Sequence, residues 1–335
     1  MKPITIALIG AGYVAGEQAR ALSQVPQAKL VTVFDAARDR AETMAAKYNM
    51  KVVDSYKQAV ESADMVWICS PPLLHEEQII EALKAGHNVF CEKPLALSMK
   101  AMKAMAKAEK ESGKQVAIGH SNRYYPAYAK AREIFASGEL GKFVSVWSQR
   151  MGHYPRELIP PWRLDPAQCG GMTVEVGVHE LDFLHWVGGE VDSVYAQQAC
   201  VVINPPDYDD SLTGMFRFKN GGFGSLALSW AYGQDIATRG IQGDKGSVMV
   251  EMMCTSVEVG PLRGERRSVP TQSPTHPETK ENLGFLWQAQ DVLQRFGEGK
   301  PHAVGIREGI AAVQLALALR KSAQENRVVK ISEVD

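Results

Sequence analysis

The sequence predicts an α/β protein with a doubly wound parallel sheet at its N-terminus, followed by an α+β domain with an open antiparallel sheet. Two observations lead to this prediction. Over roughly the first 120 residues, short apolar runs alternate with helical patterns, which indicates a parallel sheet with right-handed crossovers. Beyond that point the strand candidates are longer and are joined by turn signals such as Asn220-Gly221, which favour antiparallel pairing.

Length and composition indicate two domains of ordinary globular character. The chain has 335 residues, of which 45% are hydrophobic and 22% are charged, and this balance is typical of globular proteins. A single core rarely organises so long a chain. We expect a first domain over residues 1–121 and a second over residues 122–335, with the last helix as a candidate to pack back on the first domain.

The charge balance and the cysteines exclude several classes of protein. The formal net charge is -1, so no basic field exists to hold nucleic acid or an anionic membrane. The cysteines number five, which is odd, and they form no C-x-x-C pair. This pattern argues against a disulfide framework and a zinc knuckle, and it favours a reducing compartment.

The N-terminal apolar run is expected to be a buried strand rather than a signal peptide. It follows Lys2 and covers Ile4–Ile9, but it breaks at Gly10 in a patterned turn instead of at a small-residue cleavage site. No apolar stretch approaches the ~20 residues of a membrane span. We therefore expect a soluble, cytoplasmic protein.

The elements of the first domain follow from apolar runs, which mark buried parallel strands, and from the amphipathic stretches between them. Ser98 suits a helix N-cap, and Gly86 suits the position just after a helix. The expected strands are Ile4–Ile9, Lys29–Phe34, Lys51–Val53, Met65–Cys69, Asn88–Cys91 and Gln115–Gly119. The expected helices are Ala15–Gln24, Asp39–Tyr48, Tyr56–Glu61, His75–Ala85 and Ser98–Glu111.

The second domain shows longer strand candidates, in which apolar and polar residues tend to alternate. The segments Arg156–Pro166 and Pro261–Thr279 look like loops. The expected strands are Phe143–Met151, Val191–Ile203, Ser211–Phe218, Gly222–Tyr232, Thr238–Gly243 and Val248–Val259. The expected helices are Ala127–Ser137, Val178–Val187, Glu281–Phe296 and Ile306–Glu325.

The first strand runs directly into a G-x-G-x-x-A turn that opens a helix. Gly10 permits the tight turn, Gly12 lets the backbone approach a pyrophosphate, and Ala15 still allows close helix–strand packing. The helix that follows presents unpaired N–H groups to phosphate. This context predicts a dinucleotide-binding Rossmann domain, with a ligand-free tight turn as the alternative. The cofactor contacts expected from the turn are Gly10, Gly12, Tyr13 and Val14.

Asp35 ends the next strand, about 20 residues after the glycines, where dinucleotide-binding domains carry an acid. Such an acid bonds the ribose hydroxyls and repels a 2′-phosphate, which favours NAD over NADP. Arg38 lies nearby and could soften this preference. We expect NAD as the cofactor, with Asp35 and Arg38 among the residues that contact it.

Lys93 follows the buried strand Asn88–Cys91 and precedes Pro94. Ligands of an open α/β sheet bind outside the carboxyl ends of the strands, which is where Lys93 would lie. A lysine there can donate to a substrate hydroxyl and stabilise the alkoxide that forms as hydride leaves. The alternative is a solvated surface lysine.

Glu175, His179 and Asp182 recur at helical spacing after Gly170-Gly171, so they are expected to share one face of a helix. His179 has a pKa near working pH and can accept a hydroxyl proton as a general base, while Glu175 could hold substrate or tune the histidine. The alternative is a helix cap and a buried, hydrogen-bonded histidine.

A metal site is not expected in this segment. His179, Asp182 and His185 are the possible ligands. However, His185 lies at roughly 240° around the helix from His179, so the two imidazoles diverge.

Taken together, these residues resemble the Gfo/Idh/MocA oxidoreductase family, which includes glucose-fructose oxidoreductase and inositol dehydrogenase. The resemblance spans essentially the full length of the chain, and Glu92-Lys93-Pro94 after a buried strand is specific in this context. The matching features are Gly10 and Gly12, Ser70-Pro71 through His75, Ala85-Gly86, Glu92-Lys93-Pro94, Gly119 with Arg123-Tyr124, Gly138 with Gly141, and Gly170-Gly171 followed by Glu175, Gly177, His179 and Asp182.

The resemblance implies NAD(P)-linked oxidation of a ring hydroxyl on a sugar, cyclitol or derivative. It implies a second domain that binds substrate and that forms homodimers or homotetramers through its sheet. It makes Lys93 the catalytic lysine and His179 the acid/base, with both converging on one substrate carbon, and it puts Glu175 in the family's usual aspartate position. The residues that it implies near the nicotinamide are Ser70, Pro71, His75, Glu92 and Lys93. The substrate contacts that it implies are Arg123, Trp162, Arg163, Glu175 and His179.

Three residues depart from the family's pattern. Pro72 stands where asparagine is common, Gln18 replaces a histidine often found on the first helix, and Glu175 replaces the aspartate. The extra methylene of Glu175 moves its carboxylate by roughly 1.5 Å, which is enough to alter substrate orientation or proton transfer.

Three functions remain open at this stage. The favoured one is a dehydrogenase acting on a sugar or polyol. The second is an NAD-dependent glycoside hydrolase that oxidises the sugar transiently and eliminates the aglycone, and the motif cannot separate it from the first because the same residues serve both. The third is a non-catalytic NAD-binding regulator, which is disfavoured because Lys93 and His179 are both retained.

Overall fold

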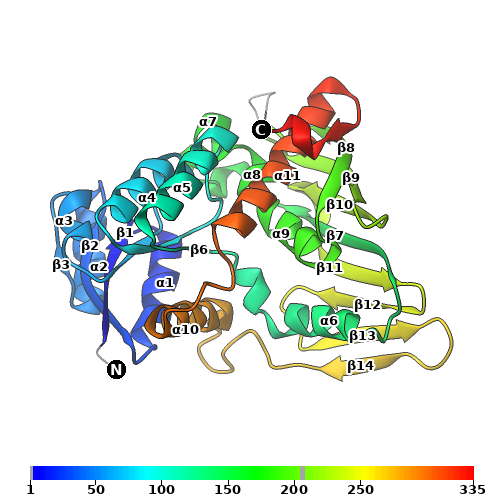
Figure 1. Cartoon of the computed structure of the whole chain (residues 1–335), viewed down its shortest axis with the longest axis horizontal. Coiled ribbons are helices and arrows are strands. Elements are labelled where there is room, and N and C mark those ends of the chain that lie inside the picture. Colours follow the sequence, from blue (N-terminus) through cyan, green and yellow to red (C-terminus); the bar gives the residue numbers. More distant parts are fainter. Residues whose placement is uncertain (1–2, 204–207) are drawn as a thin grey trace. The chain divides into compact units, whose positions relative to one another are not determined.

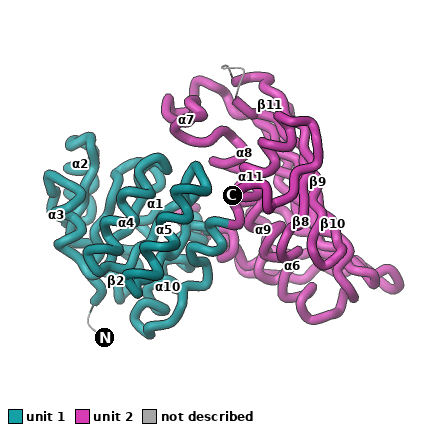
Figure 2. The backbone as a smooth tube through the Cα atoms, turned by 45° about the horizontal axis from the view of Figure 1, so that its top comes forward, with its two compact units in different colours: residues 1–121, 282–310 teal, residues 122–281, 311–335 magenta. Residues whose placement is uncertain are grey.

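The structure is a computed structural model that describes residues 3–203 and 208–335. It divides into two compact units (Figure 2). The first unit contains residues 1–121 and 282–310, and the second contains residues 122–281 and 311–335. Residues 282–310, which come near the end of the chain, therefore belong to the same unit as the N-terminal residues 1–121.

The first unit is a six-stranded sheet with helices on its faces (Figure 1). Its strands are β1 (Ile4–Ile9), β2 (Ala28–Phe34), β3 (Lys51–Val52), β4 (Met65–Ile68), β5 (Asn88–Cys91) and β6 (Val116–Ile118). Its helices are α1 (Tyr13–Ser23), α2 (Arg38–Tyr48), α3 (Tyr56–Val60), α4 (His75–Lys84), α5 (Met99–Ser112) and α10 (Leu283–Glu298), with a short 3-10 helix η1 (Pro72–Leu74).

All strand pairs in this sheet are parallel, in the order β3-β2-β1-β4-β5-β6. Helices α1, α2 and α10 bury their apolar residues in one core with the sheet, around side chains such as Leu22, Trp67 and Val292. The strand order reverses direction between β1 and β4, and open α/β sheets bind ligands at such a switch point. The predicted doubly wound parallel sheet is confirmed.

The second unit is built on a nine-stranded sheet. Its strands are β7 (Phe143–His153), β8 (Val191–Ala199), β9 (Ser211–Phe218), β10 (Phe223–Ser229), β11 (Ala231–Gly243), β12 (Gly246–Glu251), β13 (Ser256–Pro261), β14 (Arg267–Pro270) and β15 (Val329–Lys330). Its helices are α6 (Pro126–Ala136), α7 (Pro166–Cys169), α8 (Met172–Glu175) and α9 (Val178–Gly188), with 3-10 helices η3 (Arg156–Leu158), η4 (Pro161–Leu164) and η5 (Ile331–Glu333). Two further elements, η2 (Ser121–Tyr124) and α11 (Ile306–Glu325), begin in the first unit and continue in the second.

This sheet has the order β14-β13-β12-β11-β7-β10-β9-β8-β15, and every pair is antiparallel except β7 with β10. Helices pack on one of its faces. Ser322 of α11 accepts a hydrogen bond from the backbone N–H of Ala196 in β8 at 3.0 Å, and Glu180 of α9 pairs with Arg239 of β11 at 2.7 Å. The predicted α+β unit with a mostly antiparallel sheet is confirmed.

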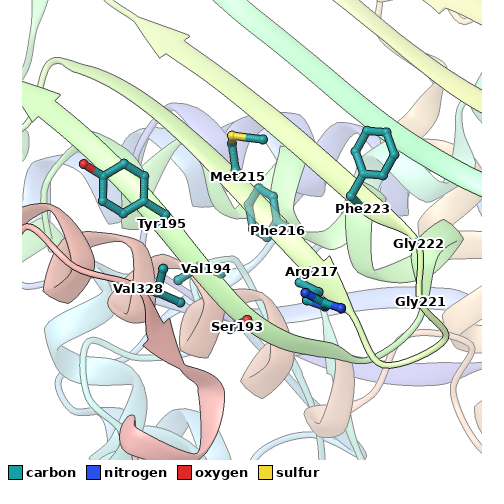
Figure 3. A pocket seen from close by; sticks show the side chains of 10 residues that line it. All are labelled: Ser193, Val194, Tyr195, Met215, Phe216, Arg217, Gly221, Gly222, Phe223 and Val328. Carbon is teal, nitrogen blue, oxygen red and sulfur yellow. The ribbon is translucent and has the colours of Figure 1, made fainter.

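The opposite face of the sheet carries apolar side chains that the described helices do not cover. Cross-strand register places Tyr195, Met215, Ser225, Trp147, Gly240 and Met249 in a single row across six strands. Met215 is 56% exposed and Phe223, in the neighbouring row, is 52% exposed. A groove of about 420 Å³ at one end of this face is lined by Tyr195, Met215, Arg217 and Phe223, among others (Figure 3). We call this surface the open face.

The structure corrects several expected elements of the second unit. The single strand expected over Val248–Val259 is two strands, β12 and β13, because Met253 adopts a left-handed conformation with φ of 62° and turns the chain. The loop expected over Pro261–Thr279 contains the short edge strand β14. The strand expected over Val191–Ile203 ends at Ala199.

Within the described residues 3–203 and 208–335, no helix is long and apolar enough to span a bilayer.

Candidate active site

The turn between β1 and α1 has the geometry of a phosphate cradle. Gly10 has φ of +91°, and a Cβ there would lie 2.8 Å from the backbone oxygen of Cys69, so only glycine fits. No described atom lies within 4 Å of where a Cβ of Gly12 would stand, which leaves room in front of its backbone. Among the described residues no side chain caps α1. Its first N–H groups can therefore receive a pyrophosphate, and the residues fit a dinucleotide.

Asp35 directly follows β2, and its side chain stabilises this turn. Its carboxylate accepts hydrogen bonds from the backbone N–H groups of Ala11, at 2.7 Å, and of Ala37, at 2.8 Å. A carboxylate has about four acceptor sites, so capacity remains for ribose hydroxyls. Arg38 lies on the surface of α2, where its guanidinium pairs with Glu42 and Asp54.

Tyr13 and Ser70 flank the same edge of the first unit's sheet. Tyr13 begins α1 and is 84% exposed. Ser70 follows β4, and its hydroxyl lies 2.5 Å from the side-chain oxygen of Gln78 in α4. Pro71 is the N-cap residue of η1 and Val14 lies in the first turn of α1. These cofactor residues remain predictions, while their positions agree with a cofactor at the switch point.

Lys93 lies in a turn after β5 whose base is a buried polar cluster. Glu92 is buried, and its carboxylate accepts hydrogen bonds from the Gln18 side chain at 2.7 Å and from the backbone N–H of Lys93 at 3.1 Å. Gln18 also donates to Gln288 of α10 at 3.2 Å. Burial raises the pKa of Glu92, although these two donors and the Lys93 charge oppose that shift. Gln18 thus supplies the Glu92 carboxylate with a neutral donor.

His75 lies between the turn after β4 and the turn after β5. It is fully buried at the start of α4, with Nδ1 2.9 Å from the Pro94 carbonyl oxygen and Nε2 2.9 Å from the Ser70 carbonyl oxygen. Burial lowers the pKa of His75. Its role next to the nicotinamide remains a prediction, whereas its contacts with both turns are structural facts.

In the second unit, Glu175 and His179 occupy two helices rather than one. Glu175 ends α8, and His179 lies in the first turn of α9. The break falls at Gly177, where a Cβ would lie 2.4 Å from the Thr173 backbone oxygen and 2.8 Å from Leu228. The single continuous helix expected to carry Glu175, His179 and Asp182 is therefore wrong, because the helix is interrupted between α8 and α9.

Arg163 of η4 pairs with Glu175. The Arg163 Nη2 and the Glu175 Oε2 lie 2.5 Å apart, and the two side chains are only 19% and 8% exposed. The guanidinium also faces the rings of Tyr154 and Trp230, at 5.8 Å and 5.5 Å from their centroids. The longer Glu175 side chain is thus paired with a guanidinium that also faces two aromatic rings. Trp162 is half-buried in the same short helix.

Two ion pairs hold α9 in the turn that follows His179. Glu180 accepts two hydrogen bonds from Arg239, both at 2.7 Å, and Asp182 accepts two from Arg123, at 2.8 and 2.7 Å. Arg123, expected to contact substrate, is thus engaged with Asp182 and lies 5.3 Å from the Trp186 ring centroid. Whether it also reaches substrate remains a prediction.

The sequence contains no indication of several residues that support the second unit's part of the candidate site. Tyr208 donates from its hydroxyl to the Arg163 carbonyl oxygen at 2.9 Å. The buried Asp209 accepts from the backbone N–H of Thr173 at 2.8 Å, just before Glu175. Neither residue lies at a recognisable spacing from the residue it supports, so no pattern in the sequence could reveal them.

Chemically, the first unit offers a nucleotide cradle and a lysine turn, and the second offers a histidine, a carboxylate and two arginines on short helices. Lys93, Glu92 and His75 are brought together with Ser70 in the first unit. Glu175 and Arg163 are brought together in the second. The first set suits binding a nicotinamide dinucleotide, and the second suits binding and deprotonating a hydroxylated substrate.

Comparison with known proteins agrees with this reading. Residues 4–120 match a family profile described as "Oxidoreductase family, NAD-binding Rossmann fold". Residues 128–249 match the profile described as "GFO/IDH/MocA C-terminal domain".

Characterised relatives are similar over most or all of the chain. Myo-inositol 2-dehydrogenase of Thermotoga maritima is 28% identical, covering 98% of this chain and 99% of the relative. Scyllo-inositol 2-dehydrogenase (NAD(+)) of Bacillus subtilis is 31% identical, covering 74% and 73% of the two chains. Among solved structures, levoglucosan dehydrogenase in complex with NADH and levoglucosan shares the fold, with a TM-score of 0.90 at 22% identity over 98% of this chain and 100% of the other.

Proposed function

The chain belongs to the Gfo/Idh/MocA oxidoreductase family, and we propose that it is an NAD-dependent dehydrogenase acting on a ring hydroxyl of a sugar, cyclitol or sugar derivative. The observation that carries the proposal is the turn between β1 and α1, with its open glycine and its brace on Asp35. Relatives named as inositol dehydrogenases support the class of substrate. Asp35 supports NAD rather than NADP.

In this proposal the chain's own residues manage the hydroxyl. Bound NAD, held by the glycine turn and Asp35, supplies the hydride acceptor. Lys93 donates a hydrogen bond to the substrate oxygen and stabilises the negative charge that develops there. His179 accepts the hydroxyl proton as general base. Glu175, Arg163 and Trp162 orient the ring.

The test is turnover by the purified protein with NAD and a panel of cyclitols, glycosides and anhydrosugars, followed by the absorbance of reduced nicotinamide. We expect NADH and a ketone in equal amounts with at least one member, and slower turnover with NADP. Cleavage of a nitrophenyl glycoside without net NADH would instead identify an NAD-dependent hydrolase. Tight NAD binding without turnover of any member would identify a non-catalytic regulator.

We also propose that the chain forms a homodimer or homotetramer through the open face. Six strands at ~4.8 Å spacing and about seven residues long give a surface of roughly 600–700 Å², close to the ~800 Å² that each partner contributes to a standard interface. We propose a second copy as the occupant, because register aligns Tyr195, Met215 and Trp147 in one row and a two-fold axis can pair such a row with itself.

Placing a charge in this row should dissociate the assembly. For Met215→Lys we expect a monomer by analytical ultracentrifugation, with an unchanged circular dichroism spectrum, because an ammonium cannot be buried unpaired between two sheets. The control is Leu262→Lys, which charges a 72% exposed residue between β13 and β14. An unchanged sedimentation coefficient for Met215→Lys would reject the open face as the interface.

A cytoplasmic location is part of the same proposal. It is supported by the five cysteines, which are all free thiols in the described structure, since reducing compartments keep thiols in this state.

A further inference from the structure

We propose that His75 is a positioning residue, which fixes the Lys93 turn by donating a hydrogen bond from Nδ1 to the Pro94 carbonyl oxygen. The inference rests on the proposed function, because it acts through the lysine assigned to catalysis. It goes beyond that function in naming a residue that sets where the lysine stands without contacting the substrate hydroxyl.

The turns after β4 and β5 begin at matching positions along the two strands. Ile68 of β4 pairs with Cys91 of the parallel neighbour β5. Ser70 and Lys93 are therefore at equivalent positions beyond the ends of the two strands. The His75 ring bridges from Ser70 to Pro94 with both of its nitrogens 2.9 Å from a carbonyl oxygen. A neutral imidazole donates to only one of these oxygens, so one contact is a hydrogen bond and the other only places the ring against the second turn, at the edge where ligands bind.

The proton can be assigned to one nitrogen of this ring. Burial lowers the pKa of His75, so the imidazole is neutral near pH 7 and has a single N–H to donate. The contact of the ring with the Pro94 carbonyl oxygen is buried, whereas its contact with the Ser70 carbonyl oxygen is partly buried. A buried carbonyl oxygen cannot accept a hydrogen bond from water. The Pro94 oxygen is therefore stabilised more by the imidazole N–H than the Ser70 oxygen is. The donor arm therefore faces Pro94 and the lysine turn.

The neighbouring contacts fix the lysine turn from its other end. The backbone N–H of Lys93 is held by Glu92, and Glu92 by Gln18. With Pro94 held by His75, the backbone on both sides of the Lys93 side chain is tied to buried groups. A shift of about 1 Å in a catalytic group can cost ~10²-fold in rate, so losing one tie is expected to show in kcat.

The experiment compares three replacements that differ in which nitrogen they keep. The amide nitrogen of Asn in His75→Asn stands near the position of Nδ1, and that of Gln in His75→Gln stands near Nε2. His75→Phe keeps neither. We expect kcat within about threefold of wild type for His75→Asn, and a loss of ~10–100-fold for His75→Gln and His75→Phe. Glu77→Gln, an exposed change on the same helix, is the matched control.

Two further readouts separate positioning from general damage. In the Lys93→Ala background, His75→Phe should lower kcat by less than about twofold, because a residue that acts through Lys93 has nothing left to position. In protein without substrate, the rate at which an amine reagent labels Lys93, relative to exposed Lys100, should change in His75→Gln and His75→Phe but not in His75→Asn.

The outcomes distinguish this proposal from the one on which it rests. If wild type turns over no substrate, the proposed function fails, while the labelling rates still decide the role of His75. Equal kcat values and labelling rates for the Asn and Gln variants would overturn the assignment to the Pro94 arm. If His75→Phe lowers kcat in the Lys93→Ala background by the same factor as it does alone, His75 does not act through the lysine.

Discussion

Replacing Lys93 by alanine is expected to lower kcat by ~10²-fold or more while leaving the protein folded, as for other positioned acid–base groups. The backbone of this turn is held by Glu92 and by the His75 contact to Pro94, so these two contacts remain when the side chain is removed. The loss should appear in kcat more than in the KM for NAD, because the ammonium stabilises charge that develops only in the transition state.

The control for this change is Lys100→Ala, which removes an exposed lysine at the start of α5. Its kcat should match wild type. Steady-state kinetics with the best substrate of the panel, together with a thermal melt of each variant, provides the measurement. A kcat near the wild-type value for Lys93→Ala would reject its catalytic role.

A double variant tests whether Lys93 and His179 act on the same substrate oxygen. If both serve one proton transfer and one developing charge, the Lys93→Ala/His179→Ala protein should lose little more activity than the worse single variant, since residues that act as a unit are strongly non-additive. Losses that multiply would mean that the two residues act independently.

The first unit shows what a sequence can reveal. Strands such as Met65–Ile68 are buried on both faces, so their residues are apolar without interruption, and such runs can be recognised directly. Glycines at forced positions, such as Gly10, also leave a local signal, because no other residue tolerates the required backbone angles beside Cys69. The predicted boundaries of these elements differ from those observed by only a few residues.

The second unit shows where local patterns fail. A methionine gives no sign that it will adopt a left-handed turn, so the break between β12 and β13 at Met253 was hidden within a continuing alternation. Gly177 was visible, but a single glycine is also tolerated inside helices. Its effect depends on Leu228, which lies on a strand distant in the sequence.

The partners of charged residues were equally hidden. Glu175 was singled out for its chemistry, yet its contact with Arg163 depends on the path of η4 between them. Arg239 is almost completely buried, and it was not singled out because arginines are usually exposed. The position of a charge in three dimensions is set by tertiary packing, which spacing along the chain does not encode.

The second large effect is expected on stability, from the buried pair of Glu180 and Arg239. Both side chains are 2% exposed, and the guanidinium also packs 4.0 Å from the Tyr128 ring centroid. Replacing Glu180 by leucine leaves that guanidinium charged in the core with its main partner gone. Breaking such a pair costs ~3–5 kcal/mol. We therefore expect a fall of this size in the free energy of unfolding for Glu180→Leu, measured by urea titration.

A double variant distinguishes two contributions to the free energy of unfolding: the destabilisation by an unpaired buried charge, and the net stabilisation by the ion pair. Glu180→Leu/Arg239→Met replaces both charges by apolar groups of similar volume, and such replacements are often neutral or stabilising. It should therefore recover most of the lost stability. The comparison is Lys219→Met, which breaks the exposed pair of Lys219 with Glu190 and should leave the urea midpoint unchanged.

The same pair predicts a dependence of stability on pH. Burial alone would raise the pKa of Glu180, but the Arg239 charge and hydrogen bonds, with smaller effects of the Arg150 charge and the Ser148 hydrogen bond, outweigh burial and hold the pKa below its usual value of 4.5. A carboxyl whose native pKa is depressed stabilises the fold above its unfolded pKa and loses that contribution as the pH falls through the native value. Between pH 7 and about pH 3, wild type should therefore lose more stability than Glu180→Leu/Arg239→Met. Parallel pH profiles for the two proteins would mean that the native pKa of Glu180 equals its unfolded value, and would reject this prediction.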